Sequence, residues 1–367
     1  MSPETWTLRS GNDCLVVSPM GATVLDWQVC DLRAGDSAQQ VAGTETKESA
    51  KASSYWEDGL ADSSGVSAYQ SDYRADSAPT CPGCVHVLDG YRSQDEARQM
   101  DGFRNALLAP WSNRIRDGKY CFQGKEYDFK GETIGGELAL HGLIANQVFE
   151  LIELKPDYLR AKVRVPKLEA YPFEVEIEVT YQISSSPHRL SLDMVAHNKG
   201  TGDAPITLGW HPYFLCPTGR AKNAKVTIAA ENLVVTDEQL IPLRGQAAFC
   251  AQESPVILYG RGDFDCAYTS LIPKDGVAWA VLEHLNGSST VLQMAGAKQG
   301  QGLASFQVYS AQDLLNRAGE SIAVEPLLAM TDAFNRPECQ DLVTVSPRVL
   351  TRDACVHRAP YVRLTTF

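Results

Sequence analysis

The sequence predicts an all-β protein whose strands pair in antiparallel sheets. Residues 173–183 alternate apolar and polar side chains, which is the pattern of a strand with one buried face and one wet face. Residues 159–165, 190–195 and 226–230 repeat this alternation. Long stretches with apolar residues at helical spacing are missing, and strands without intervening helices pair antiparallel, as in a sandwich or a barrel.

The other elements fit between these strands. Residues 21–29 and 85–91 read as further strands, and residues 94–100 read as at best a short helix. Clusters of turn-forming residues at 198–202 and 286–289 separate the later strands.

One segment breaks the pattern. Residues 34–83 are rich in Ser, Ala, Asp and Gly and contain few large apolar side chains, so they cannot supply much core. We expect this segment to be a surface insertion. No internal repeat or second domain is evident, so residues 1–367 are expected to form a single β-sandwich domain that carries this insertion.

Composition and charge narrow the classes of function. The chain has 367 residues, 44% of them apolar, and a net charge of −12 at pH 7, a balance typical of a globular chain that buries a sizeable core. An acidic surface repels phosphate backbones, so nucleic acid is not an expected partner. No segment has the ~18 apolar residues of a membrane helix, and no apolar signal segment opens the chain. A cytoplasmic location without a membrane partner is therefore expected.

The ten cysteines are spread from Cys14 to Cys355. In a reducing cytosol such residues are mostly small buried side chains. Cys81 and Cys84 are a close pair, but one pair without a second pair or a nearby histidine does not make a structural zinc site. We expect a loop turn with two idle thiols there, and a weak redox or metal role is the alternative.

Common catalytic signatures are absent from the sequence. Residues 296–302 have neither the spacing nor the Lys-Ser/Thr ending of a P-loop. There is no dinucleotide fingerprint, nucleophile elbow or His-Glu-x-x-His motif. Kinases, Rossmann dehydrogenases, α/β hydrolases and zincins are therefore poor candidates, and neither a cofactor nor a metal ion is expected.

Polar residues in apolar or aromatic surroundings form the candidate site. Asn113 and Arg114 precede a strand-like run, His141 lies between an apolar run and a glycine, and His211 lies among aromatic residues. Glu325 stands in a nearly apolar run, where an ionised carboxylate is costly unless it is paired, exposed or functional. Each histidine alone is more often a hydrogen-bonded core residue, and the arginine could close a structural salt bridge.

A second carboxylate beside an aromatic residue completes this set, and it is either Asp265 or Asp263. Two histidines, a glutamate, an aspartate and an arginine supply acid–base groups and partners for hydroxyls. Without a metal or nucleophile motif, the set suits proton transfer on a polyhydroxylated ligand.

These residues lie in blocks that resemble the aldose 1-epimerases (galactose mutarotases). The blocks keep the family's order and approximate separations: residues 108–120 (LAPWSNRIRDGKY), 140–142 (LHG), 211–214 (HPYF), and Glu325-Pro326 with Asp332-Ala-Phe-Asn335. The resemblance covers most of residues 102–337. It implies a large antiparallel β-sandwich of the galactose-mutarotase type, with the sugar in an open cleft on one face.

The resemblance also implies roles for the candidate residues. Glu325 matches the general base that takes the proton of the anomeric hydroxyl, and His211 matches the general acid that protonates the ring oxygen. His141 and Arg114 match residues that hold ring and hydroxyl oxygens. Asp265 matches a sugar-binding carboxylate, with Asp263 as the rival assignment.

Two further residue types are expected to contact the sugar. Asn113 belongs to the matched Asn-Arg pair. Trp210, like Trp111 and Tyr213, is either a stacking surface for a pyranose or part of the core. Leu143 departs from the family's common Leu-His-Gly-Gly, and this departure leaves the sugar preference open.

The resemblance implies an aldose 1-epimerase that interconverts the anomers of a free hexose, galactose or glucose, as a monomer or homodimer. One alternative is a mutarotase for hexose 6-phosphates, which requires a cationic pocket, and only Arg104 and Arg116 lie near the motifs besides Arg114. The other is a catalytically silent carbohydrate-binding protein of the same fold.

Overall fold

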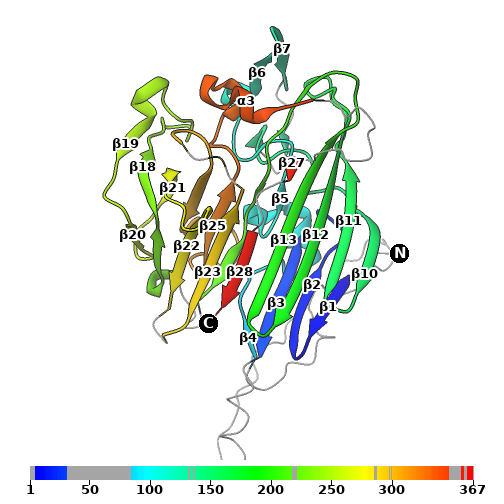
Figure 1. Cartoon of the computed structure of the whole chain (residues 1–367), viewed down its shortest axis with the longest axis vertical. Coiled ribbons are helices and arrows are strands. Elements are labelled where there is room, and N and C mark those ends of the chain that lie inside the picture. The colour runs from blue at the N-terminus through cyan, green and yellow to red at the C-terminus, as the bar shows by residue number, and fades with distance from the viewer. Residues whose placement is uncertain are drawn as a thin grey trace, which may run out of the picture.

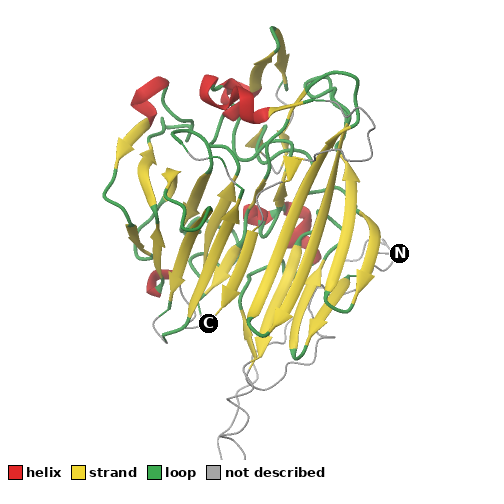
Figure 2. Ribbon diagram, in the orientation of Figure 1, coloured by secondary structure: helices red, strands yellow, loops and turns green. Residues whose placement is uncertain are grey.

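The fold is an antiparallel β-sandwich, as the sequence predicts (Figure 1). The computed structural model describes residues 5–30, 84–130, 133–134, 137–216, 221–284, 287–296, 298, 300–346, 357–358 and 362–366. Strands dominate this part of the chain, and the helices are short (Figure 2). The predicted insertion at 34–83, with Cys81, lies outside the described residues.

The widest layer of the sandwich is one large sheet, whose strands lie side by side in Figure 1. Its order is β10 (Glu150–Lys155), β11 (Tyr158–Arg164), β12 (Val175–Ser185), β13 (His188–Asn198), β28 (Val362–Thr366), β23 (Ser289–Ala295), β22 (Val277–Glu283), β17 (Lys225–Ile228) and β20 (Val256–Tyr259), with β27 (His357–Arg358) also paired to β13. The predicted strands at 159–165, 173–183 and 190–195 are β11, β12 and β13.

A second large sheet carries three of the seven candidate residues, Trp210, Asp265 and Glu325. Its order is β19 (Phe249–Ala251), β18 (Ala230–Val234), β21 (Asp265–Leu271), β24 (Ser305–Tyr309), β25 (Ser321–Leu327), β15 (Gly209–Trp210) and β5 (Leu107–Leu108), with β16 (Tyr213–Leu215) also paired to β25. The predicted single strand at 226–230 is wrong in one respect. The chain leaves the first sheet after Ile228 and enters the second at Ala230. Ile228, Ala229 and Ala230 are all buried, so the alternation stops at the bend.

The smaller elements complete the described chain. A four-stranded sheet contains β1 (Trp6–Ser10), β2 (Asp13–Val17), β3 (Val24–Cys30) and β4 (Cys84–His86). Three two-stranded sheets pair β6 (Lys119–Phe122) with β7 (Lys125–Asp128), β8 (Thr133–Ile134) with β9 (Glu137–Leu138), and β14 (Ala204–Pro205) with β26 (Thr344–Val345). The α-helices are α2 (Gln94–Gln99) and α3 (Gln340–Val343), and the 3-10 turns are Asp101–Phe103, Arg116–Gly118, Ala221–Asn223, Gly245–Ala248, Ala333–Asn335 and Pro337–Cys339.

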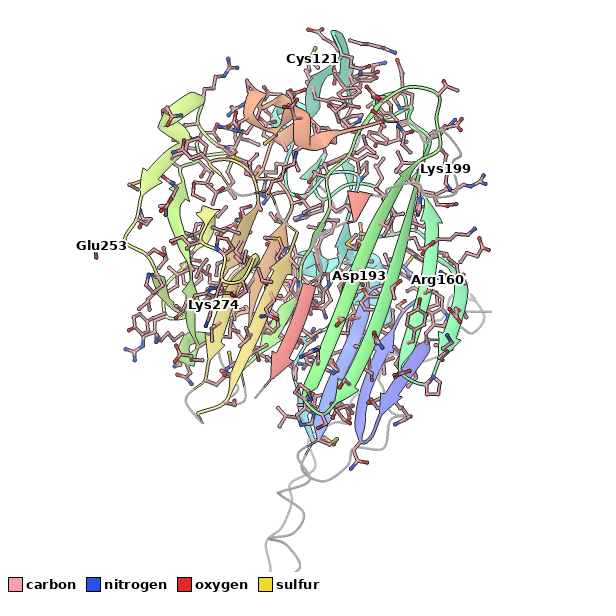
Figure 3. The ribbon with its side chains drawn as sticks, in the orientation of Figure 1. Cys121, Arg160, Asp193, Lys199, Glu253 and Lys274 are labelled. Carbon is pink, nitrogen blue, oxygen red and sulfur yellow. A yellow bond between two sulfur atoms is a disulfide. The ribbon has the colours of Figure 1, made fainter. Side chains whose placement is uncertain are left out.

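The core lies between the sheets. Alternate residues of β12, among them Ile177 and Tyr181, are fully buried and belong to one hydrophobic cluster with Trp27 of β3 and Val308 of β24. The outward positions of β11, β12 and β13 are mostly polar, and Figure 3 labels Arg160, Asp193 and Lys199 along this layer. Burial of one face of each strand is what the period-two pattern of the sequence encodes.

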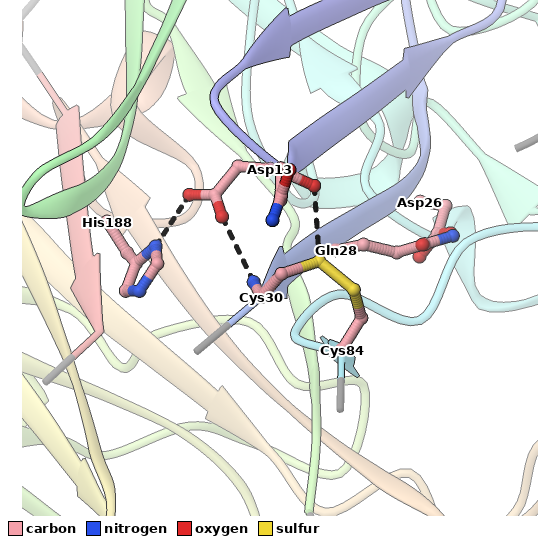
Figure 4. Close-up of a disulfide and its surroundings, with 7 residues drawn as sticks. Asp13, Asp26, Gln28, Cys30, Cys84 and His188 are labelled. Atoms are coloured by element: carbon pink, nitrogen blue, oxygen red, sulfur yellow. Dashed lines mark hydrogen bonds and ion pairs between the residues drawn. A yellow bond between two sulfur atoms is a disulfide. The ribbon is translucent and has the colours of Figure 1, made fainter. Parts of the chain in front are cut away.

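A disulfide joins β3 to β4 and corrects the prediction for the cysteines (Figure 4). Cys84 is bonded to Cys30, at a sequence separation of 54, and is not an idle thiol. Asp13 accepts a hydrogen bond from the Cys30 backbone N–H at 3.0 Å and lies 2.7 Å from Nδ1 of His188. Disulfides persist in oxidising surroundings. The cysteines therefore no longer support the expectation of a reducing, cytoplasmic location.

The remaining cysteines match the prediction in part. Cys14, Cys216 and Cys339 are buried, whereas Cys121 and Cys250 are exposed. None of the helices described is long and apolar enough to cross a membrane.

Candidate active site

The register of the second large sheet lines up the polar residues of the cleft. Across β24 and β25, Gln307 is the partner of Glu325, and two residues along the strands Tyr309 is the partner of Ala323. Across β21 and β24, Asp265 is the partner of Tyr309. Side chains of antiparallel partners project to the same face, and residues two apart on a strand share that face. Asp265, Gln307, Tyr309 and Glu325 therefore project from one side of the sheet.

A tight loop places Asn113 and His141 against each other. The backbone N–H of His141 donates to the carbonyl of Asn113 at 3.0 Å, and the backbone N–H of Asn113 donates to Nδ1 of His141 at 3.3 Å. Both residues have positive φ, 57° at Asn113 and 59° at His141. Arg114 forms an isolated bridge with Leu140, so the Asn-Arg and Leu-His-Gly segments lie side by side.

Gly142 makes this close approach possible. Its φ is +80°, and a Cβ at this position would lie 2.1 Å from the carbonyl oxygen of Ala109. The same oxygen accepts the backbone N–H of Leu143 at 2.7 Å. Leu143 is buried in the main core, so the departure from Leu-His-Gly-Gly adds an apolar anchor behind the loop.

Asn105 fixes the segment that carries His211. The backbone N–H of His211 donates to Ala106, and the carbonyl of His211 accepts from the N–H of Asn105, both at 3.0 Å. The side-chain oxygen of Asn105 accepts the N–H of Tyr213 at 2.9 Å, and its amide donates to Val24 at 2.9 Å. A fully buried asparagine thus satisfies the carbonyl of His211 and the N–H of Tyr213.

The His211 ring is held by aromatic contacts. It is stacked on Tyr213, with centroids 5.0 Å apart and an angle of 7° between the planes. His141 meets it edge-on at 5.1 Å. The ring therefore has a defined orientation toward Glu325.

Glu325 and His211 form a buried pair of titratable groups. Oε1 of Glu325 lies 3.4 Å from Nε2 of His211, and the residues are 2% and 5% exposed. Burial raises the pKa of Glu325 well above its usual range, with a further rise from Asp265 that Arg114 opposes. Burial also lowers the pKa of His211 to about 3. Burial thus disfavours the charged form of each group.

Two atoms of this pair have no hydrogen-bond partner among the described residues. They are Oε2 of Glu325 and Nδ1 of His211. A buried polar atom without a partner costs free energy, and such atoms concentrate at functional sites. His141 is also held neutral, because burial and the nearby His211 and Arg114 lower its pKa well below the usual range.

The pair opens into a cleft of about 320 Å³, a size typical of small-molecule sites. The residues that line it are Gln99, Met100, Asp101, Gly102, Phe103, Asn113, Arg114, Leu140, His141, His211, Tyr213, Leu240, Asp265, Tyr309, Asp313, Leu314, Leu315 and Glu325. All the predicted site residues are among them except Trp210. Of the rival aspartates, Asp265 lines the cleft, whereas Asp263 does not and accepts a hydrogen bond from Ser310 at 3.1 Å.

The structure places Trp210 in the core and not in the cleft. Its side chain is 1% exposed, and its indole N–H donates to the carbonyl of Asn105 at 3.1 Å. Trp111 is likewise buried, with its N–H donated to Ala139 at 2.9 Å. Neighbouring residues on a strand project to opposite faces. His211 therefore reaches the cleft, while Trp210, the residue before it, packs into the core.

Sequence reasoning missed Gln307, Tyr309 and Asp313. The amide of Gln307 donates to Oδ1 of Asp265, and the hydroxyl of Tyr309 donates to Oδ1 of Asp313. These residues lie in an ordinary strand and the turn after it, so only strand register could have found them.

The Asp332-Ala-Phe-Asn335 block supports the cleft from behind. The N–H of Asp332 donates to the carbonyl of Arg114 at 2.9 Å, and its carboxylate accepts from the N–H of Arg116 at 2.9 Å. Asn335 donates to the same carboxylate oxygen at 2.7 Å. Asp332 and Arg116 line a separate cavity of about 520 Å³.

Comparison with known proteins gives a consistent family. A family model described as aldose 1-epimerase matches residues 82–347. The uncharacterized protein YihR of Escherichia coli (strain K12) is 27% identical over 240 residues, which cover 62% of this chain and 71% of that protein. A galactose mutarotase of Sus scrofa is 28% identical over 164 residues, which cover 42% of this chain and 46% of that protein. The match thus spans less than half the length of that mutarotase.

Solved structures share the fold across the whole chain. The GalM/aldose epimerase homologue from C. elegans superposes with a TM-score of 0.71 at 13% identity, covering 99% of this chain and 98% of that one. A putative aldose 1-epimerase from Escherichia coli K12 superposes with a TM-score of 0.66 at 16% identity, covering 99% of both chains. At these identities the likeness supports the fold and not a particular activity.

Proposed function

This chain belongs to the aldose 1-epimerase family and is an isomerase of the mutarotase type, and from that premise we propose that it interconverts the α and β anomers of a free hexose such as galactose or glucose. The observation that carries this proposal is the buried pair of Glu325 and His211 at the cleft, 3.4 Å apart. Mutarotation requires one group that accepts a proton and one that donates it, and no redox step.

The proposed reaction uses the pair as one unit. We take the pair to hold one exchangeable proton. Its passage from Glu325 to His211 generates a carboxylate and an imidazolium, so the pair supplies a base and an acid together. Glu325 takes the proton of the anomeric hydroxyl while His211 protonates the ring oxygen. The bond between C1 and the ring oxygen breaks, and the anomeric carbon becomes an aldehyde. Rotation about C1–C2 and reclosure with the two roles exchanged give the other anomer.

The neighbouring groups support this proton transfer. Arg114 favours the charged form of Glu325, because its guanidinium lowers the pKa of the carboxyl against the effect of burial. His141, held neutral with its Nδ1 accepting the N–H of Asn113, carries its proton on Nε2 and can donate a hydrogen bond to the sugar. Asp265 and Asn113 line the same cleft and offer further partners for hydroxyls.

The charge of the cleft favours a free hexose over a hexose 6-phosphate. Of the described residues that line it, Arg114 carries the formal positive charge, against the carboxyl groups of Asp101, Asp265, Asp313 and Glu325. The two other arginines that could have bound a phosphate are engaged elsewhere. Arg104 is fully buried against Asp89 at 2.6 Å, and Arg116 contacts Asp237 at 3.1 Å and lines the other cavity.

Polarimetry of freshly dissolved α-D-galactose and α-D-glucose tests the proposal. We expect a rate well above the buffer reaction that is lost in Glu325→Gln and His211→Asn, by about 10²–10⁴-fold for each proton-transfer group. Glu253→Gln and His284→Asn change the same residue types outside the cleft and should leave the rate unchanged. Sugar binding with no rate above buffer would indicate a silent binding protein instead.

A further inference from the structure

The cleft extends beyond the reacting pair along β24. Tyr309 lies two residues from Gln307, the cross-strand partner of Glu325. Since a strand rises about 3.4 Å per residue, Tyr309 is roughly 7 Å farther along the cleft. A pyranose whose C1 lies at Glu325 and His211 therefore presents its opposite end to Tyr309 and to Asp265, the cross-strand partner of Tyr309.

The side chain of Tyr309 is fixed at this position. Its hydroxyl donates to Oδ1 of Asp313, and its ring meets Tyr213 edge-on at 6.3 Å and 85°. Tyr213 is the ring on which His211 stacks. The tyrosine is half-buried and the aspartate is exposed at the rim, where Leu314 and Met100 complete the wall of the cleft. The pair thus has a fixed relation to the proton-transfer groups.

This end of the cleft offers hydrogen-bond acceptors. The proton of Tyr309 is committed to Asp313, so its oxygen is left with lone pairs, and an ionised Asp313 has acceptor sites alone. The nearby amide donor of Gln307 is committed to Asp265. Arg114 belongs to the loop beside His141 and Asn113, at the reacting end. A hydroxyl of the sugar can donate to these acceptors, whereas a phosphate or carboxylate has no proton to give and meets like charge.

We propose that Tyr309 and Asp313 form a specificity-determining pair that accepts a hydrogen bond from a hydroxyl remote from C1 and rejects aldoses with an anionic group at that end. This inference rests on the proposed mutarotase activity and assigns to the pair a choice among substrates, with no part in proton transfer. Sugar phosphates and uronic acids are the substrates that the pair excludes.

NMR measurement of the exchange between anomers at equilibrium tests this assignment. The sugars compared are glucose, galactose, glucose 6-phosphate and glucuronate. Asp313→Asn keeps an acceptor for Tyr309, removes the charge and adds an N–H donor. We expect kcat/KM for the anionic sugars relative to glucose to rise by about fivefold to tenfold, mainly through KM, because one charge at the rim interacts through largely aqueous surroundings. Tyr309→Phe should lower kcat/KM for glucose by about twofold to tenfold through loss of one hydrogen bond.

Three controls separate specificity from structure and from overall charge. Glu253 lies at the outer edge of the molecule (Figure 3) and does not line the cleft, so Glu253→Gln removes one charge and should leave the ratio unchanged. Asp313→Glu should restore the preference for neutral sugars. Added salt should raise kcat/KM for the anionic sugars relative to glucose more in the wild-type protein than in Asp313→Asn.

The outcomes are distinguishable. A wild-type protein that converts glucose but shows the same ratio in Asp313→Asn overturns the specificity assignment and leaves the mutarotase proposal intact. Equal turnover of glucose and glucose 6-phosphate by the wild type would also overturn the specificity assignment and leave the mutarotase proposal intact. No turnover of any neutral aldose overturns both proposals.

Discussion

The ring of Tyr213 lies between His211, which stacks on it, and the buried guanidinium of Arg104, whose Cζ is 5.1 Å from the tyrosine centroid. Arg104 is itself fully buried and paired with Asp89 at 2.6 Å. Its charge adds to the lowering of the His211 pKa that burial causes. The ion pair thus influences the histidine through an aromatic ring, without lining the cleft.

The first prediction concerns the stack. Tyr213→Leu removes the aromatic surface beneath His211, and we expect kcat to fall by roughly 10²-fold, since a misplacement of about 1 Å can cost this much. Tyr213→Phe keeps the stack and loses only the hydrogen bond to the carbonyl of Gly102 at 2.7 Å. It should retain most of kcat and lose about 1 kcal/mol of unfolding free energy. Equal activity loss in the two variants would contradict a positioning role for the ring.

The second prediction concerns the buried ion pair. The Asp89 carboxylate accepts hydrogen bonds from Arg104 at 2.6 Å and Ser321 at 2.8 Å and contacts Arg317 at 3.3 Å. Asp89→Asn leaves the buried guanidinium of Arg104 with the more distant Asp101, at 3.8 Å, as its counter-ion and should lower the free energy of unfolding by about 3–5 kcal/mol. Chemical denaturation measures this loss. Asp95→Asn breaks an exposed contact with Arg98 and should change stability by no more than about 0.5 kcal/mol.

The third prediction concerns the pH dependence of stability. The folded-state pKa of Glu325 is raised above its unfolded value, so the native protein binds more protons above about pH 4.5. Stability present below that pH is lost as pH rises toward the folded pKa. Glu325→Gln lacks this loss and should be more stable than wild type near pH 7 by about 1–3 kcal/mol while it is inactive. Urea titrations at a series of pH values should show the two proteins converging toward pH 4.5, and parallel curves would contradict a raised pKa.

The pKa shift of His211 makes stability change with pH in the opposite direction. The pKa of His211 is lowered to about 3 in the native protein, so the unfolded chain binds more protons between about pH 6.5 and pH 3. Stability from this group is lost as pH falls through that window. We expect His211→Asn to be less sensitive to acid than wild type over the same range, with urea titrations as the measurement.

Local sequence predicted the candidate residues because each stands out from its surroundings. Glu325 lies in a fully buried strand, and His141 precedes a glycine that the backbone requires. Trp210 carried the same local signal as His211 but projects into the core. Local context does not say which face of a strand lines a cleft.

Pairing between distant segments was not readable from the sequence. Tyr309 becomes a cleft residue because it lies opposite Asp265 in register, and Cys84 bonds to Cys30 across a separation of 54 residues. Both depend on non-local contacts that no spacing rule encodes. The division at Ala229 between two sheets has the same origin, because it depends on which distant strands pair with residues 225–228 and 230–234.

The last prediction concerns Gly142. A methyl group at this position would lie 2.1 Å from the carbonyl oxygen of Ala109, which also accepts the N–H of Leu143. Gly142→Ala therefore adds a backbone clash to the strain of a φ of +80°, and the loop must shift together with His141. We expect a loss of more than about 2 kcal/mol of stability, together with a fall in kcat/KM of tenfold or more.

Gly124 is the matched control for this variant. Its φ is +77°, but a Cβ there would meet nothing within 4 Å, so Gly124→Ala adds backbone strain alone. It should cost about 1 kcal/mol and leave kcat/KM unchanged. Unfolding curves and polarimetric rates for the two alanine variants separate the effects. If Gly142→Ala behaves like Gly124→Ala, the close approach of the two loops does not hold His141 in place.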